Sequence, residues 1–218
     1  MRINFSRSIV LLALTAGQPS IAATLAVLPG SGGFQNSGFG SNTLGWGFTL
    51  ANALTVTDLG YFDGNAGLTD PHPVGIWNSI GTLIANATVP SGAAADLVSG
   101  FRFVPIAPVI LGPGAYSIGG YANTSPDEFR WQVSSVTTVA GLSFGSANLY
   151  TQASSLTRPT TVAEVFSPYG YFGANFMVSS STPTAVPEPD SIGMWLLGLA
   201  IVMGRRFRRA ESGLKLRA

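Results

Sequence analysis

Seven short stretches of residues most strongly limit what this chain can fold into, because they have the pattern of β-strands. They are rich in aromatic and β-branched side chains and are separated by turn-forming clusters of Gly, Pro, Asn and Ser. No long segment shows the 3.6-residue repeat of an amphipathic helix. The pattern predicts an all-β fold, an antiparallel and jelly-roll-like β-sandwich. The expected strands cover residues 44–50, 54–62, 74–77, 82–89, 101–104, 115–121 and 171–178.

The composition changes on either side of these strands. Residues 23–43 are glycine-rich and are expected to form a lead-in, whereas residues 179–185 are a Ser/Thr/Pro linker. The β-sandwich is therefore predicted to be one domain over 44–178. The chain has no cysteine, so its core must be stable without disulfides.

The charge of the body differs from that of the whole chain. Between residues 24 and 186, three arginines stand against seven carboxylates, a net charge of −4, although the whole chain has +1. The body also has no lysine, which argues against nucleic acid as a partner. Asp127 and Glu128, close to Arg130, are expected in a solvated turn with a weak local ion pair.

The first 22 residues have the three parts of a secretory signal peptide. Arg2 and Arg7 supply a basic start, residues 9–16 are an apolar helical segment, and the sequence Ser-Ile-Ala ends at Ala22. This pattern predicts export and cleavage after Ala22, with cleavage one or four residues later as the alternatives.

The C-terminal tail also has three parts. Two prolines fix φ and disfavour helix in the residue before each, which predicts an extended, protease-accessible segment at Val186, Pro187, Glu188 and Pro189. Twelve apolar residues follow at 192–203, and then the cluster Arg205, Arg206, Arg208 and Arg209. A helix of that length rises only about 18 Å, whereas the hydrocarbon core of a bilayer is roughly 30 Å thick. A short, marginal transmembrane helix over 191–204 is predicted, with 210–218 as a basic cytoplasmic tail.

This order of parts at 186–209 resembles the PEP-CTERM sorting signal of Gram-negative bacteria, a region also labelled an ice-binding-protein C-terminal domain. The resemblance implies export through the inner membrane, with signal peptidase and the export machinery as partners, and then cutting near Pro-Glu-Pro by a membrane-embedded exosortase. It also implies a surface or extracellular-matrix protein in bacteria that make exopolysaccharide or biofilm. Both basic ends obey the positive-inside rule, which leaves the body outside. The alternative is an ordinary single-pass anchor with a proline-rich stalk.

The body carries a second resemblance. The segments Gly45-Trp-Gly-Phe-Thr49, His72-Pro-Val-Gly-Ile-Trp77 and Phe101-Arg-Phe-Val104 resemble DUF4082-like β-sandwich modules of exported bacterial proteins. That resemblance implies a jelly-roll fold and an extracellular location, and no known reaction.

The body offers few residues for catalysis. A serine triad needs a histidine, and the chain has only His72, which stands between two prolines and is expected to support a turn at the start of a strand. There is no Gly-x-Ser-x-Gly motif. No pattern marks Asp58 or Asp63 with Glu164 as a glycosidase pair. We therefore expect no enzymatic activity and no catalytic residue.

One loop contains several oxygen donors. Asp63, Asn65 and Asp70 fall in a glycine-containing segment, and Ca²⁺ prefers six to eight oxygen ligands. The loop lacks the terminal glutamate and the helices of an EF-hand, so we interpret it as a solvated hairpin loop, with a Ca²⁺ site as the alternative. No other cofactor is expected.

Aromatic residues suggest a second kind of binding surface, because sugar rings stack on flat apolar groups. Trp46 and Trp77 lie within apolar strands and are expected in the core, whereas Trp131, Tyr169 and Tyr171 are the candidate ligand contacts. The sequence thus indicates a non-catalytic surface or matrix protein, with exopolysaccharide as a candidate partner. The alternative is a carbohydrate-binding module or adhesin with a glycan or Ca²⁺ site.

Overall fold

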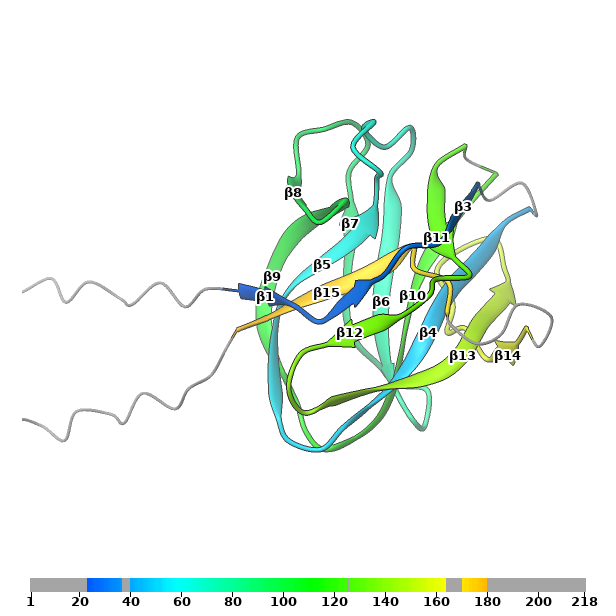
Figure 1. Ribbon diagram of the computed structural model, residues 1–218. Coiled ribbons are helices and arrows are strands. Elements are labelled where there is room, and N and C mark those ends of the chain that lie inside the picture. Colours follow the sequence, from blue (N-terminus) through cyan, green and yellow to red (C-terminus); the bar gives the residue numbers. More distant parts are fainter. Residues whose placement is uncertain (1–22, 37–39, 125, 164–169, 180–218) are drawn as a thin grey trace, which may run out of the picture. The chain divides into compact units, whose positions relative to one another are not determined.

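The computed structural model describes residues 23–36, 40–124, 126–163 and 170–179 (Figure 1). Regular secondary structure in these residues consists of β-strands, and the paired strands run antiparallel. The all-β prediction is confirmed, and a strand lies at each of the seven expected places. The predicted signal and transmembrane helices lie outside the described residues. Within the described part, no helix has the length and apolar character needed to span a membrane.

The described strands form two larger sheets and two small strand pairs. The first sheet has the order β1 (Ala23–Leu25), β15 (Ala174–Ser179), β5 (Leu54–Phe62), β9 (Phe101–Leu111) and β8 (Asp96–Val98). The second has the order β14 (Thr161–Val162), β13 (Leu142–Gln152), β4 (Asn42–Leu50), β10 (Gly114–Ala122), β6 (His72–Asn78) and β7 (Leu83–Val89). The small pairs are β3 (Gly33–Asn36) with β11 (Glu128–Trp131), and β2 (Val27–Pro29) with β12 (Val136–Thr138).

Side chains from both larger sheets form one hydrophobic core. Trp46 of β4 is fully buried, and its ring stacks on that of Phe176 of β15 with centroids 6.0 Å apart. The indole Nε1 donates a hydrogen bond of 2.9 Å to the carbonyl oxygen of Ala174, which satisfies the polar group of a buried tryptophan. The predicted core position of Trp46 is confirmed.

Trp77 is also buried, as expected, but it packs on the other face of the second sheet. Its neighbour in β6, Ile76, points into the main core, and successive side chains of a strand point to opposite faces. A Cβ added to Gly75 would lie 2.9 Å from the Trp77 ring and 3.2 Å from the Leu156 side chain. The segment before β14 therefore covers this tryptophan on the outer face.

The residues expected to form a lead-in are part of the fold. Strands β1, β2 and β3 all fall within 23–43, and they pair with β15, β12 and β11 respectively. Their partners lie roughly a hundred or more residues later in the chain, so local composition could not indicate the pairing. The β-structure thus begins well before residue 44.

Candidate functional site

The strand pair β3–β11 presents charged and aromatic side chains on one face. Phe129 of β11 points inward and is 1 % exposed, so Glu128 and Arg130 on either side of it point outward. Phe34 of β3 is the direct cross-strand partner of Arg130 and is 55 % exposed. The guanidinium carbon of Arg130 lies 5.3 Å from the centroid of the Phe34 ring, which is the geometry of a cation–π contact.

A tight turn and a loop form the facing wall. Ser99 and Gly100, between β8 and β9, both have positive φ (51° and 83°), as a two-residue type I′ hairpin requires. The carbonyl oxygen of Gly100 accepts hydrogen bonds from the backbone N–H groups of Asp63 and Gly64, at 2.8 and 3.2 Å. These bonds hold the loop that follows β5 against the turn.

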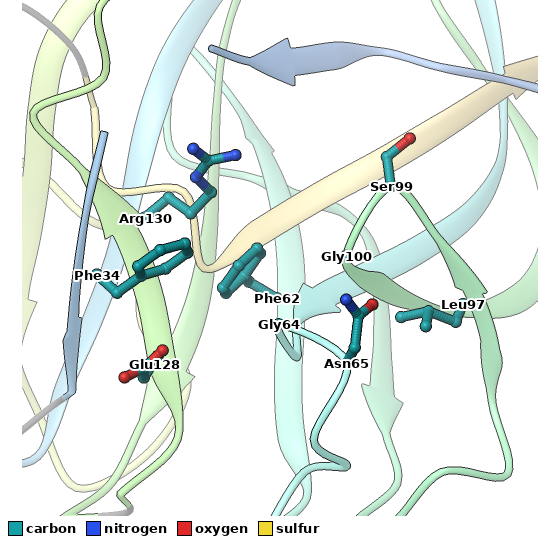
Figure 2. A pocket seen from close by; sticks show the side chains of 9 residues that line it. All are labelled: Phe34, Phe62, Gly64, Asn65, Leu97, Ser99, Gly100, Glu128 and Arg130. Atoms are coloured by element: carbon teal, nitrogen blue, oxygen red, sulfur yellow. The ribbon is translucent and has the colours of Figure 1, made fainter. Parts of the chain in front are cut away.

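Between these walls lies a groove of about 600 Å³, which we call the Phe34 groove. This volume is within the range of small-molecule sites in proteins, roughly 300–1,000 Å³. The ring of Phe34 stacks on the buried Phe62 with centroids 5.8 Å apart. Figure 2 shows Phe34 between Arg130 and Glu128, with Asn65 and Leu97 across the groove. The side chains that line the groove include Phe34, Phe62, Asn65, Leu97, Glu128 and Arg130.

The Arg130 guanidinium has few protein partners. Its Nη1 donates one long bond of 3.5 Å to the carbonyl oxygen of Pro29, and its buried Nε has no hydrogen-bond partner among the described residues. Arg102, in contrast, makes three short bonds: it donates to Asp63 at 2.7 Å and to the carbonyl oxygens of Ala93 and Ala95 at 2.9 and 3.0 Å. The Nη groups of Arg130 therefore retain N–H donors for a ligand, whereas the buried Nε is closed to one.

The three proposed Ca²⁺ ligands have separate roles. Asp63 is 8 % exposed, and its Oδ2 accepts the short bond from Arg102 described above, so a cation would compete with a guanidinium. Asn65 is exposed, with a φ of 82°, in the turn beside the Phe34 groove. The backbone N–H of Asp70 donates 3.0 Å to Asp127. Among the described residues there is no group of three or more His, Asp or Glu side chains that could hold a metal ion.

Asp127 corrects one expectation, because it is buried and not in a solvated turn. Its carboxylate accepts hydrogen bonds from the backbone N–H groups of Thr69 and Asp70 and lies 2.9 Å from Nε2 of His72. This aspartate fixes the 69–70 turn. Its partners offset the free-energy cost of burying a carboxylate, which would be high without them.

His72 stands at the start of β6, as expected, but it is enclosed by protein. It is 0 % exposed, its Nδ1 lies 3.0 Å from the carbonyl oxygen of Tyr121, and its ring stacks on Tyr61 at 3.8 Å. Burial, and secondarily the Asp127 carboxylate, raises the pKa of Tyr61 well above its usual value. Both ring nitrogens of His72 face acceptors inside the fold, so the imidazole is used to hold β6, β10 and Asp127 together.

The predicted sugar contacts lie mostly inside the fold. Tyr171 is 8 % exposed and meets Phe129 edge to face at 5.4 Å, and burial raises its pKa. Trp131 is partly buried against the same small cluster. Tyr169 lies outside the described residues. Phe34 is not among the residues that the aromatic pattern indicated, although an aromatic residue within a polar, glycine-rich stretch was the available signal.

The comparisons with known proteins concern the C-terminal tail. Residues 185–209 match the PEP-CTERM protein-sorting motif, and this range contains the predicted motif Val186–Pro189 and the arginine cluster. Neither a curated protein nor a solved structure matches the chain. The tail and the predicted cleavage site at Ala22 lie outside the described residues. The chain thus carries a PEP-CTERM sorting motif, which implies export, transient membrane anchoring and processing by an exosortase.

Proposed function

We propose that this protein is exported by a Gram-negative bacterium, cut by an exosortase near Pro187 to Pro189, and delivered to the cell surface or extracellular matrix. There its body would act without catalysis, in contact with exopolysaccharide. The observation that carries this proposal is the sorting motif at 185–209. The signal-peptide pattern over the first 22 residues supports it, because a basic, exported N-terminus and a C-terminal sorting motif agree with a body outside the membrane.

We further propose that the body is a jelly-roll-like β-sandwich of the DUF4082-like kind. The strand order supports this. Taken in chain order, eight strands (β1, β4, β5, β6, β7, β9, β10 and β15) are arranged as 1-8-3-6 in one sheet and 2-7-4-5 in the other. This order agrees with that of a jelly roll, in which two Greek keys place successive strands in opposite sheets, apart from the fourth and fifth, which pair in one sheet. Strands β13 and β14 would then extend the second sheet beyond β4.

The non-catalytic part of the proposal has its own support. The imidazole of His72 is fully buried and is used by Asp127 and Tyr121, so a substrate has no route to it in this conformation. Asp63 is likewise occupied by Arg102. His72 and Asp63 therefore have structural partners, whereas Glu164 lies outside the described residues.

The experiment that tests the sorting proposal compares two forms of the full-length chain in cells with and without an exosortase. Pro187→Ala/Glu188→Ala/Pro189→Ala should remain in the membrane fraction, whereas the unchanged chain should leave it only in cells that have the enzyme. A control with alanine at Ser180 and Ser181, in the linker, should be released normally. Equal release of all forms in both cell types would refute exosortase processing.

A second candidate function is a carbohydrate-binding module or adhesin. It is favoured by the Phe34 groove, which combines an exposed aromatic ring with arginine, glutamate and asparagine side chains. Flat apolar surfaces beside polar groups are suited to sugars, whose faces are apolar and whose edges carry hydroxyls.

A further inference from the structure

We propose that the Phe34 groove binds an acidic saccharide, with the carboxylate of a uronic acid on Arg130 and the sugar ring against Phe34. This inference rests on the proposed function in the matrix, and it names the site and the charge of the ligand.

Arg130 carries the preference for an acid. A guanidinium presents several N–H donors in a plane that matches the two oxygens of a carboxylate, and such bonds are stronger than neutral ones. Only one long bond from Nη1 of Arg130 reaches a protein acceptor in the described chain, and the ring of Phe34 covers part of the group. An incoming carboxylate would meet open donors and would also complete the pairing of a partly buried cation.

Phe34 supplies the surface for the sugar ring. It is 55 % exposed, although its partner in the stack, Phe62, is only 3 % exposed. The buried Phe62 therefore holds the Phe34 ring in place, and much of the Phe34 ring remains exposed in the groove. Leu97, 39 % exposed in β8, adds apolar area on the facing wall. Covering these exposed apolar groups with the apolar face of a sugar would favour binding.

Glu128 and Asn65 are suited to the hydroxyl groups. Glu128 and Arg130 are two residues apart on one face of β11, and two residues of a strand span about 7 Å, so one short oligosaccharide can meet both. Glu128 also lowers the affinity of an acid through repulsion. Because the body has a net charge of −4, attraction to an acidic ligand must come locally from Arg130.

The test titrates the full-length protein in detergent with tetragalacturonic acid and with its methyl ester, which keeps the sugar chain but removes the charges. The acid should bind at least about tenfold more tightly than the ester, a difference of about 1.4 kcal/mol. Binding of the acid should weaken as salt is added, because salt screens the attraction between charges. Arg130→Gln should remove this preference, and Phe34→Ala should weaken the binding of both ligands. Glu128→Gln should strengthen binding of the acid.

The control is Arg158→Gln, which removes the same charge outside the groove and should leave both affinities unchanged. Thermal melting of each variant checks its folding. Glu128→Gln, at an exposed position, should gain affinity for the acid, and an unfolded protein could not show such a gain. Equal affinity for acid and ester, or no effect of Arg130→Gln, would overturn the assignment of an acidic ligand. Absence of binding to either ligand would overturn the groove as a sugar site. Neither result would alter exosortase processing, which the membrane-release experiment tests separately.

Discussion

Replacing Asp127 by alanine should strongly destabilise the fold. The carboxylate accepts bonds of 2.8 and 2.9 Å from Thr69 N–H, one of 3.0 Å from Asp70 N–H, and lies 2.9 Å from Nε2 of His72. Hydrogen bonds to a charged group contribute about 1.5–3 kcal/mol each, and removing one partner of a buried charged pair costs about 3–5 kcal/mol. The three donors share one acceptor group, so their contributions do not add, and we expect a total loss of about 3–5 kcal/mol.

The assay is urea unfolding of the full-length protein, followed by tryptophan fluorescence. The loss should appear as a lower midpoint with an unchanged m value, and as a fall in Tm of about 10 °C for a chain of this size. Asp127→Asn keeps one acceptor oxygen, so its unfolding midpoint should lie between those of the unchanged protein and Asp127→Ala. Asp96→Ala, at an exposed carboxylate in β8, should stay within about 0.5 kcal/mol of the unchanged protein. A loss below about 1 kcal/mol for Asp127→Ala would refute the assignment of Asp127 to a buried hydrogen-bond network.

Three further predictions concern the core, the outer face and metal binding. Trp46→Ala should cost about 3–5 kcal/mol in urea unfolding, because it empties the centre of an aromatic cluster. Gly119→Val should lower the free energy of unfolding by about 1–3 kcal/mol, because an added Cβ would lie 3.0 Å from the ring of Pro159. Gly112→Ala should have little effect, because no atom lies within 4 Å of an added Cβ there. Similar losses for the two variants would contradict the close packing at Gly119. Addition of Ca²⁺ should leave Tm unchanged because Asp63 is already paired with a buried arginine, and a concentration-dependent rise in Tm would contradict this expectation.

The strands that could be predicted from the sequence are those in which large apolar side chains alternate with smaller residues. In β4, Leu44, Trp46, Phe48 and Leu50 alternate with smaller residues, and these four side chains are buried. Such alternation is a local property of a strand with one face in the core, so it can be read without knowing the partner strand. Strand β13, over 142–152, lacks so regular an alternation, and its pairing with β4 is shifted between Gly145 and Asn148.

The candidate site was harder to predict because its parts are distant in sequence. Phe34 and Arg130 are direct partners across β3 and β11, and Asp127 meets His72, 55 residues earlier. Short-range composition made Asp127 resemble a surface residue and placed Phe34 in a glycine-rich lead-in. Only the pairing of strands brings these residues together, and pairing depends on the register of the whole fold. The sorting motif, by contrast, is contiguous, and for that reason the sequence alone was sufficient to recognise it.

Intact-mass measurement of the exported protein, from cells that contain an exosortase, is the most direct test of the sorting function. The mature chain should begin at Ala23, after cleavage at Ala22, and should end near Pro187 to Pro189, apart from any group attached at the new C-terminus. Its mass should therefore lack both the signal peptide and the apolar, arginine-rich tail. A mature chain that still ends at Ala218 would contradict processing at the PEP-CTERM motif.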